Sequence, residues 1–229
     1  MELSKRLYAV AGLVTEGASV ADIGTDHGYI PIYLVENRIS PRVIAMDINR
    51  GPLERARFHI QEHGMEAQIE TRLSDGLSAL VPGEADTMIA AGMGGGLVIK
   101  ILTQTPQVTD SLQEFILQPQ SEIAKVREYL NSNGFISVAE DMVEEDGKFY
   151  PMMKMRRGQE TGYSQAELHY GRLLLEKRHP VLYRYLLKER DVKDRLRENL
   201  RIQAGDRVKI RLEEIEKELA LTAQALKYY

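Results

Sequence analysis

The sequence predicts an α/β protein with a doubly wound sheet and a helical C-terminal part. Two observations predict the sheet: short apolar runs that end in Gly, Asp or Pro recur through the first half of the chain, and helical segments separate them. Repeating strand–helix units of this length form a parallel sheet that helices cover on both faces. A third observation is that the residues beyond 163 read as helical throughout, so a helical part is expected to follow the sheet.

The predicted elements follow one another in a regular order. An amphipathic helix is expected over 3–14, where the apolar positions fall on one stripe. Strands are then expected at 20–23, 43–46, 69–73, 87–91 and 114–117, with helices near 29–38, 51–63, 95–104 and 121–132. Two further strand-like runs, 135–143 and 150–155, flank an Asp146-Gly147 pair that is typical of a hairpin turn. Strand–helix units followed by a hairpin make a seven-stranded, Rossmann-like sheet.

The C-terminal part is predicted to be a helical hairpin. Residues 158–163 read as a linker, so we expect domains at 1–158 and 159–229. Ala204-Gly205-Asp206 supplies a helix stop and a helix start between two apolar stripes. The stripes are Leu182, Leu186, Leu196 and Leu200, then Val208, Leu212, Ile215, Leu219 and Leu226, with a vacancy at Thr222. We expect the stripes to pack within a monomer; the alternative is a homodimer formed through a coiled coil.

Composition limits the class of protein. A chain of 229 residues can hold one α/β domain and a smaller appendage. No apolar run approaches the roughly 20 residues needed to cross a bilayer, and the N-terminus lacks the apolar stretch of a signal peptide. The absence of cysteine excludes disulfides and a thiol nucleophile. We therefore expect a cytoplasmic protein that does not associate with membranes.

The net charge of −4 conceals two parts of opposite sign. Residues 1–158 carry −7 and residues 159–229 carry +3. A polyanionic partner would therefore favour the C-terminal part.

A glycine-containing loop follows the first predicted strand and opens a helix. Gly24 and Gly28 let the backbone approach a ligand closely, and the helix N-terminus presents N–H groups to it. Dinucleotide-binding enzymes share such loops, but here the run begins with acidic Asp22, as in the methyltransferases that use S-adenosylmethionine (SAM). Asp47 ends the next strand, where it can bind ribose hydroxyls, and Asp75 ends the third, where it can accept a hydrogen bond from adenine.

The three acids predict SAM as the cofactor, the alternative being that turns and helix N-caps favour Asp in any case. No metal site is predicted. The expected cofactor contacts are Asp22, Gly24, Thr25, His27, Gly28, Asp47, Ile48, Asp75, Gly76, Gly92, Met93 and Gly94.

Asp26 and Tyr29 are the candidates for a role in catalysis. Asp26 stands where the methyltransferase pattern has its middle glycine, and burying its carboxylate would be costly without a partner. His27 is adjacent and could help, or could serve only as a structural hydrogen-bond donor. Tyr29 could belong to the core or offer a stacking surface.

Two further loops are expected at the same edge of the sheet. Strand four ends in Gly92-Met93-Gly94, where glycines would let the cofactor or a flat substrate approach the backbone; tight helix packing is the alternative. Strand five ends at Gln118, which could hydrogen-bond a base edge or simply cap the strand.

Four segments together resemble the bacterial tRNA (adenine-22, N1)-methyltransferase family: LSKRL at 3–7, DIGTDHGY at 22–29, AGMGG at 91–95 and LQP at 117–119. The resemblance runs from Leu3 to about Met155. It implies a seven-stranded class I methyltransferase core, a C-terminal coiled-coil hairpin, SAM as methyl donor and tRNA as substrate. It also implies that Asp26 matches the family's acidic residue at the catalytic site.

The chemistry that this implies is transfer of a methyl group to adenine N1. The N1 lone pair can attack the methyl in line, so positioning supplies most of the acceleration, and the Asp26 carboxylate would stabilise the cationic product ring. Because N1 lies on the Watson–Crick edge, the base must be unpaired or flipped. Lys5, Arg6 and basic residues within 184–211 are expected to contact phosphates. The alternatives are a small-metabolite methyltransferase, a non-catalytic nucleotide- or RNA-binding module and, third, an NAD-dependent oxidoreductase.

Overall fold

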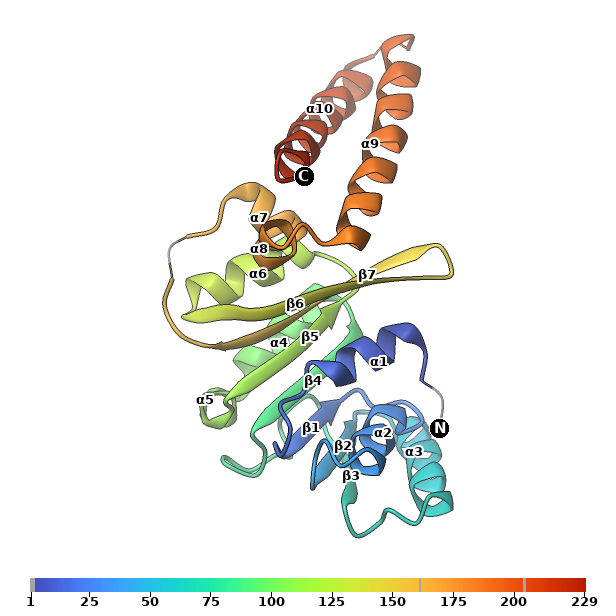
Figure 1. Cartoon of the computed structure of the whole chain (residues 1–229), viewed down its shortest axis with the longest axis vertical. Coiled ribbons are helices and arrows are strands. Elements are labelled where there is room, and N and C mark those ends of the chain that lie inside the picture. Colours follow the sequence, from blue (N-terminus) through green and yellow to red (C-terminus); the bar gives the residue numbers. More distant parts are fainter. Residues whose placement is uncertain (1–2, 161, 204) are drawn as a thin grey trace. The chain divides into compact units, whose positions relative to one another are not determined.

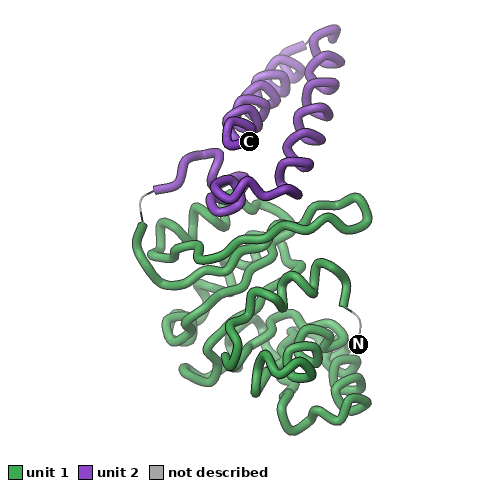
Figure 2. The backbone as a smooth tube through the Cα atoms, in the orientation of Figure 1, with its two compact units in different colours: residues 1–160 green, residues 161–229 purple. Residues whose placement is uncertain are grey.

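The computed structural model describes residues 3–160, 162–203 and 205–229 (Figure 1). The chain forms two compact units, residues 1–160 and 161–229 (Figure 2). The predicted linker lies at this division, although residue 161 within it and residue 204 of the predicted interruption are outside the described residues.

The first unit is built on a seven-stranded sheet, which confirms the predicted fold class. The strand order is β3-β2-β1-β4-β5-β7-β6, and β7 runs antiparallel to both of its neighbours while the other pairs are parallel. The strands are β1 Val20–Ile23, β2 Val43–Asp47, β3 Ile69–Leu73, β4 Thr87–Met93, β5 Glu114–Pro119, β6 Phe135–Glu145 and β7 Lys148–Arg157. The β6–β7 turn is Asp146-Gly147, as predicted, and both residues have a positive φ, 50° and 71°.

Helices cover both faces of the sheet, because alternate strand residues are apolar on each face. Ala21 and Ile23 of β1 join one core cluster, and Val20 joins the other. The first cluster contains residues of α4 Gly95–Gln104, α5 Pro106–Ser111 and α6 Ile123–Ser132. The second contains residues of α1 Lys5–Gly12, α2 Tyr29–Glu36 and α3 Arg50–Glu62. The short helix α5 was not predicted, since six residues are too few to show a helical period.

The strand order reverses between β1 and β4. From β1 the chain builds outward through β2 and β3, and then returns to place β4 on the other side of β1. Crossover connections therefore leave in opposite directions at the carboxyl ends of these two strands. In open α/β sheets this switch point opens a crevice in which ligands bind.

The second unit is helical, with α7 Gln165–Tyr170, α8 Arg172–Glu176, α9 Pro180–Arg201 and α10 Asp206–Leu226. Helices α9 and α10 pack on each other as the predicted hairpin. The vacancy in the second apolar stripe is filled by a polar cluster: Thr222 is fully buried, its hydroxyl lies 2.9 Å from the Tyr170 hydroxyl, and it donates to Glu189 at 3.2 Å. Burial and the nearby Glu189 carboxylate raise the pKa of Tyr170, so this hydroxyl stays protonated.

Candidate active site

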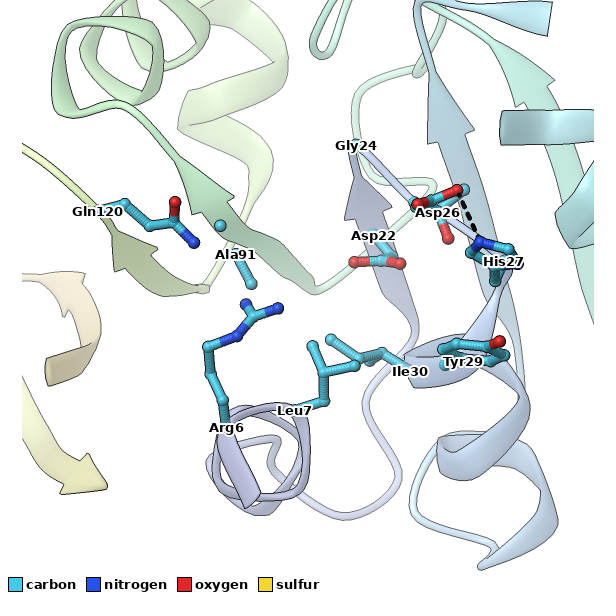
Figure 3. Close-up of a pocket in the computed structure, with 12 residues that line it drawn as sticks. Arg6, Leu7, Asp22, Gly24, Asp26, His27, Tyr29, Ile30, Ala91 and Gln120 are labelled. Atoms are coloured by element: carbon cyan, nitrogen blue, oxygen red, sulfur yellow. Dashed lines mark ion pairs between the residues drawn. The ribbon is translucent and has the colours of Figure 1, made fainter. Parts of the chain in front are cut away.

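A cavity of about 370 Å³ lies at the switch point (Figure 3). Six parts of the chain contribute to it: α1, the end of β1, the loop after β1, the start of α2, the end of β4 and the segment after β5. The lining residues are Arg6, Leu7, Asp22, Gly24, Thr25, Asp26, His27, Tyr29, Ile30, Ala91, Gly92 and Gln120. The structure thus gathers Arg6, both candidate catalytic residues and part of the predicted cofactor set around one space.

Asp22 places a buried carboxylate against this cavity. The residue is 5% exposed and is the penultimate residue of β1, before the loop. Burial raises the pKa of Asp22 to about 6, and the carboxylate of Asp47 adds to the rise. The nearby Thr25 hydroxyl acts in the opposite direction. A buried carboxylate with a pKa this close to neutrality is typical of a functional site.

The loop after β1 has the features of a cofactor cradle. Gly24 has a φ of +74°, and a Cβ on it would overlap the terminal methyl of Met93. The hydroxyl oxygen of Thr25 and the Nδ1 atom of His27 are buried and form no well-aligned hydrogen bond with any described residue. Buried polar atoms are nearly always paired, so these two atoms fit a polar ligand that binds against the loop.

Gly28, a predicted cofactor contact, has a packing role at the start of α2. It has a φ of +71°, caps the N-terminus of α2, and a Cβ there would lie 3.3 Å from the Cβ of Ala56 on α3. It does not line the cavity. Its small size lets α2 and α3 approach each other.

Asp26 is exposed and paired rather than buried. Its side chain is 58% exposed, and its Oδ1 atom accepts hydrogen bonds from Nη2 and Nε of Arg55 at 2.7 and 3.2 Å. The Nε2 atom of His27 lies 3.5 Å from the same oxygen (Figure 3). The pairing of Asp26 with Arg55 was not predicted from the sequence.

Tyr29 belongs to a group of three nearly parallel rings. The centroids of His27, Tyr29 and His59 lie 5.1, 5.4 and 5.6 Å apart, with interplanar angles of 13°, 20° and 17°. The His59 ring also hydrogen-bonds the carbonyl of His27 at 2.8 Å. Arg55 and His59 are one turn apart on α3 and therefore share a face, a spacing that could have identified both residues.

On the opposite side of the cavity, Arg6 connects α1 with β5. Its Nη1 atom donates to Oε1 of the buried Gln118 at 2.9 Å, and its guanidinium lies 5.7 Å from the ring centroid of Tyr150. The expected partner Lys5 is exposed at the start of α1, where its backbone N–H donates to Glu145 at 2.6 Å.

The other predicted cofactor residues lie outside the cavity lining. Asp47 and Asp75 end β2 and follow β3, the strands next to β1 on one side of the sheet. Oδ1 of Asp47 accepts the N–H of Asn49 at 2.7 Å, whereas Asp75 is 3.4 Å from Nζ of Lys100. Ile48 is 58% exposed.

The remaining three predicted contacts serve packing in this structure. A Cβ on Gly76 would come within 3.1 Å of Ile101 in α4, and Gly94 is the N-cap of α4. The side chain of Met93 lies over Gly24 and packs against the core.

No group of three or more His, Cys, Asp or Glu side chains in ranges 3–160, 162–203 and 205–229 is arranged to hold a metal ion. Within those same ranges, no helix combines the length and apolarity needed to span a bilayer.

Comparison with known proteins agrees with this geometry. Residues 3–153 match the family model described as a methyltransferase domain. The chain is 36% identical over 175 residues to the tRNA (adenine(22)-N(1))-methyltransferase of Bacillus subtilis, covering 76% of this chain and 74% of that protein.

Solved structures are similar over nearly the whole chain. The structure of the B. subtilis m1A22 tRNA methyltransferase TrmK has a TM-score of 0.85 at 31% identity and covers 98% of each chain. Streptococcus pneumoniae Sp1610 in complex with SAM has a TM-score of 0.87 at 30% identity, covering 98% of this chain and 100% of that one.

Proposed function

The chain belongs to the bacterial tRNA (adenine-22, N1)-methyltransferase family, and we propose that it transfers the methyl group of SAM to N1 of adenine 22 in tRNA. The observation that carries this is the switch-point cavity, in which a buried carboxylate, a glycine cradle and Asp26 surround one space. The relatives with this reaction in their names extend over most of the chain.

The loop after β1 fits the cofactor. SAM supplies the electrophilic methyl group, and we propose that Asp22, Gly24, Thr25 and His27 hold its amino-acid end. The buried polar atoms of Thr25 and His27, which form no well-aligned hydrogen bond with the described residues, support this assignment. The ribose and adenine ends are assigned to residues at the ends of β2, β3 and β4: Asp47, Ile48, Asp75, Gly76, Gly92, Met93 and Gly94.

Asp26 is proposed to act on the target adenine. Its carboxylate has one oxygen on Arg55, while the other can accept a hydrogen bond from the exocyclic amino group. The negative charge would also stabilise the positive charge that develops on the ring during transfer. Adenine donates through its amino group, whereas guanine presents a carbonyl at the same position, so this contact would also select the base.

Tyr29 is proposed to stack on the target base. Its ring is half-buried at the cavity wall and supported by His27 and His59. A base flipped out of the RNA commonly stacks on aromatic side chains in this way. Arg6 on the other wall, together with Lys5 and Gln118 outside the cavity lining, is assigned to the RNA.

The partner and place of action follow from the substrate. We propose that the C-terminal helices provide additional contacts to tRNA, consistent with the +3 charge of residues 159–229. The protein is further proposed to act as a monomer in the cytoplasm.

The test is incubation of the protein with labelled SAM and an unmodified tRNA transcript, followed by nucleoside mass spectrometry. We expect 1-methyladenosine, and a transcript with guanine at position 22 should gain no label. Methylation of metabolites without RNA would instead support a small-molecule enzyme, and the absence of any transfer would support a binding module.

A further inference from the structure

A second cavity lies beside the first, between the end of β5 and the start of β7. Its volume is about 310 Å³. Its walls come from the segment 118–123 and from the β7 residues 148–151. The proposed function assigns the target adenine to the first cavity and leaves this one without a role.

The two cavities are neighbours that share a lining residue. Gln120 lines both. Arg6 lines the first cavity and also contacts two residues of the second cavity. Its guanidinium donates a hydrogen bond to Gln118 and lies 5.7 Å from the ring centroid of Tyr150. The Arg6 guanidinium therefore forms the partition, with the first cavity on one side and the Tyr150 ring on the other.

The lining of the second cavity has the chemistry of a nucleobase site. Tyr150 and Phe149 are half-buried aromatic residues, and Ile123 adds an apolar surface. The amide of Gln120 offers a donor and an acceptor, and the amide of Gln118, whose oxygen already accepts from Arg6, adds a second polar group to the wall. Proteins that recognise unpaired RNA combine stacking on aromatic rings with hydrogen bonds to base edges.

The charges around the cavity favour a base inside it and a phosphate at the partition. Lys148 is exposed, but it pairs in register with Glu145, next to Asp146 in the acidic turn of the hairpin. This end of the cavity would repel a phosphate. The guanidinium of Arg6 is positive and lies between the two cavities, where a phosphate that links two nucleosides would have to lie.

We propose that the second cavity binds the base of a nucleotide adjacent to the target adenosine in the same RNA strand, stacked on Tyr150. This rests on the proposed function, which puts the target adenine in the first cavity. Two consecutive nucleotides would then occupy the two cavities, with their shared phosphate on Arg6. The enzyme would hold the flipped adenosine through its neighbour as well as through its own ring.

The experiment compares Tyr150→Ala, Tyr150→Leu and Tyr150→Phe with the unaltered chain. Leu keeps apolar bulk in β7 but has no ring, whereas Phe keeps the ring. Filter binding gives the Kd for the unmodified tRNA transcript, and steady-state kinetics give KM and kcat. Tyr8→Ala, which removes a 59% exposed ring that lines neither cavity, is the matched control.

Loss of base stacking should raise the Kd and KM for tRNA about tenfold in the Ala and Leu variants. In the Ala and Leu variants, the Kd for SAM and the kcat at saturating tRNA should stay within about twofold of the values for the unaltered chain. For Tyr150→Phe and Tyr8→Ala, every measured value should stay within about twofold of the unaltered chain. Unchanged tRNA binding by folded Tyr150→Leu would overturn the proposal. If the unaltered chain binds tRNA but does not methylate it, the proposed function fails, while the Kd comparison still decides this site.

Discussion

The guanidinium of Arg55 holds the Asp26 carboxylate from the second turn of α3, with two hydrogen bonds to one oxygen. Asp26 therefore has a defined orientation although it is more than half exposed. The positive charge of Arg55 also partly balances the negative charge of the Asp26 carboxylate. In the proposed mechanism Arg55 is a positioning residue, since it would act on the substrate through Asp26.

Replacing Asp26 should abolish most methylation without affecting the cofactor. Asp26→Asn keeps the shape of the side chain but removes its charge, and we expect kcat for tRNA to fall by about 10²–10³, the range for loss of a group that stabilises transition-state charge. The Kd for SAM, measured by calorimetry, should stay unchanged. Full activity in Asp26→Ala would end the proposed role.

Replacing Arg55 should reduce kcat by about tenfold because Asp26 loses its orientation. Arg55→Lys, which can make one of the two hydrogen bonds, should recover part of the loss. Arg57→Ala is the matched control, since Arg57 bonds Thr71 rather than the loop. If Arg55→Ala changed only the melting temperature and not kcat, its role would be purely structural.

Asp22 should make the protein less stable as pH rises from about 4 to about 6. Its folded-state pKa of about 6 lies above the ordinary 3.8, so in this window the folded chain keeps a proton that the unfolded chain has lost. The free energy of unfolding then falls with rising pH, by up to about 3 kcal/mol. Above about pH 6 the titration of Asp22 no longer changes it. Urea unfolding of the unaltered chain and of Asp22→Asn at pH 4.5 and 7.5 measures the difference.

The Asn variant should be the more stable protein at pH 7.5 and should lose this part of the pH dependence. SAM carries positive charge, so its binding should favour the ionised carboxylate and release a proton near pH 6. Calorimetry in buffers of different ionisation enthalpy detects that release. No difference in proton release between the two proteins would contradict the assignment of Asp22 to the cofactor.

Gly24→Ala should weaken both the fold and cofactor binding. A φ of +74° costs a residue with a Cβ about 1–2 kcal/mol, and the added methyl would displace Met93. We expect the free energy of unfolding to drop by that amount and the Kd for SAM to rise at least about tenfold. Gly12→Ala, at a position with open space and no positive φ, should have neither effect.

The ion pair between Arg127 of α6 and Glu140 of β6 is buried, with side chains 2% and 1% exposed. Removing one partner leaves a buried charge, so Arg127→Met should cost about 3–5 kcal/mol in urea unfolding. The double variant Arg127→Met with Glu140→Val should recover most of the loss. Lys125→Met, which breaks an exposed pair with Glu122, the N-cap residue of the same helix, should leave stability unchanged.

Exposed cations on the C-terminal helices are the candidates for tRNA contacts. Many of their cations are held by acidic side chains, as Arg201 is by Glu216 at 3.3 Å. Arg195 and Arg207 are exposed and form no ion pair with the described residues. Arg195→Ala and Arg207→Ala should each weaken tRNA binding and reduce its salt dependence by about one unit of slope. Arg201→Ala should change neither the tRNA affinity nor its salt dependence. Equal effects of the three substitutions would show that the net charge of the helices matters and that Arg195 and Arg207 have no specific contact.

The sequence by itself determined the order of most strands and helices along the chain and the position of the glycine loop. These depend on apolar periods and turn residues within short segments, which local physics fixes. It also located Asp22 and Asp26, because both follow a recognisable strand within a few residues. The row of acids at the ends of β1, β2 and β3 followed from strand polarity, although Asp47 and Asp75 bond elsewhere in this structure.

Only the tertiary structure decided which side chains meet across those elements. Arg55 is 29 residues from Asp26, and Arg6 is 112 residues from Gln118. Thr222, read from the sequence as a gap in a stripe, is a buried member of a polar cluster with Tyr170 and Glu189. No local period encodes such pairs, because each forms only when packing has brought two separate segments within hydrogen-bond distance.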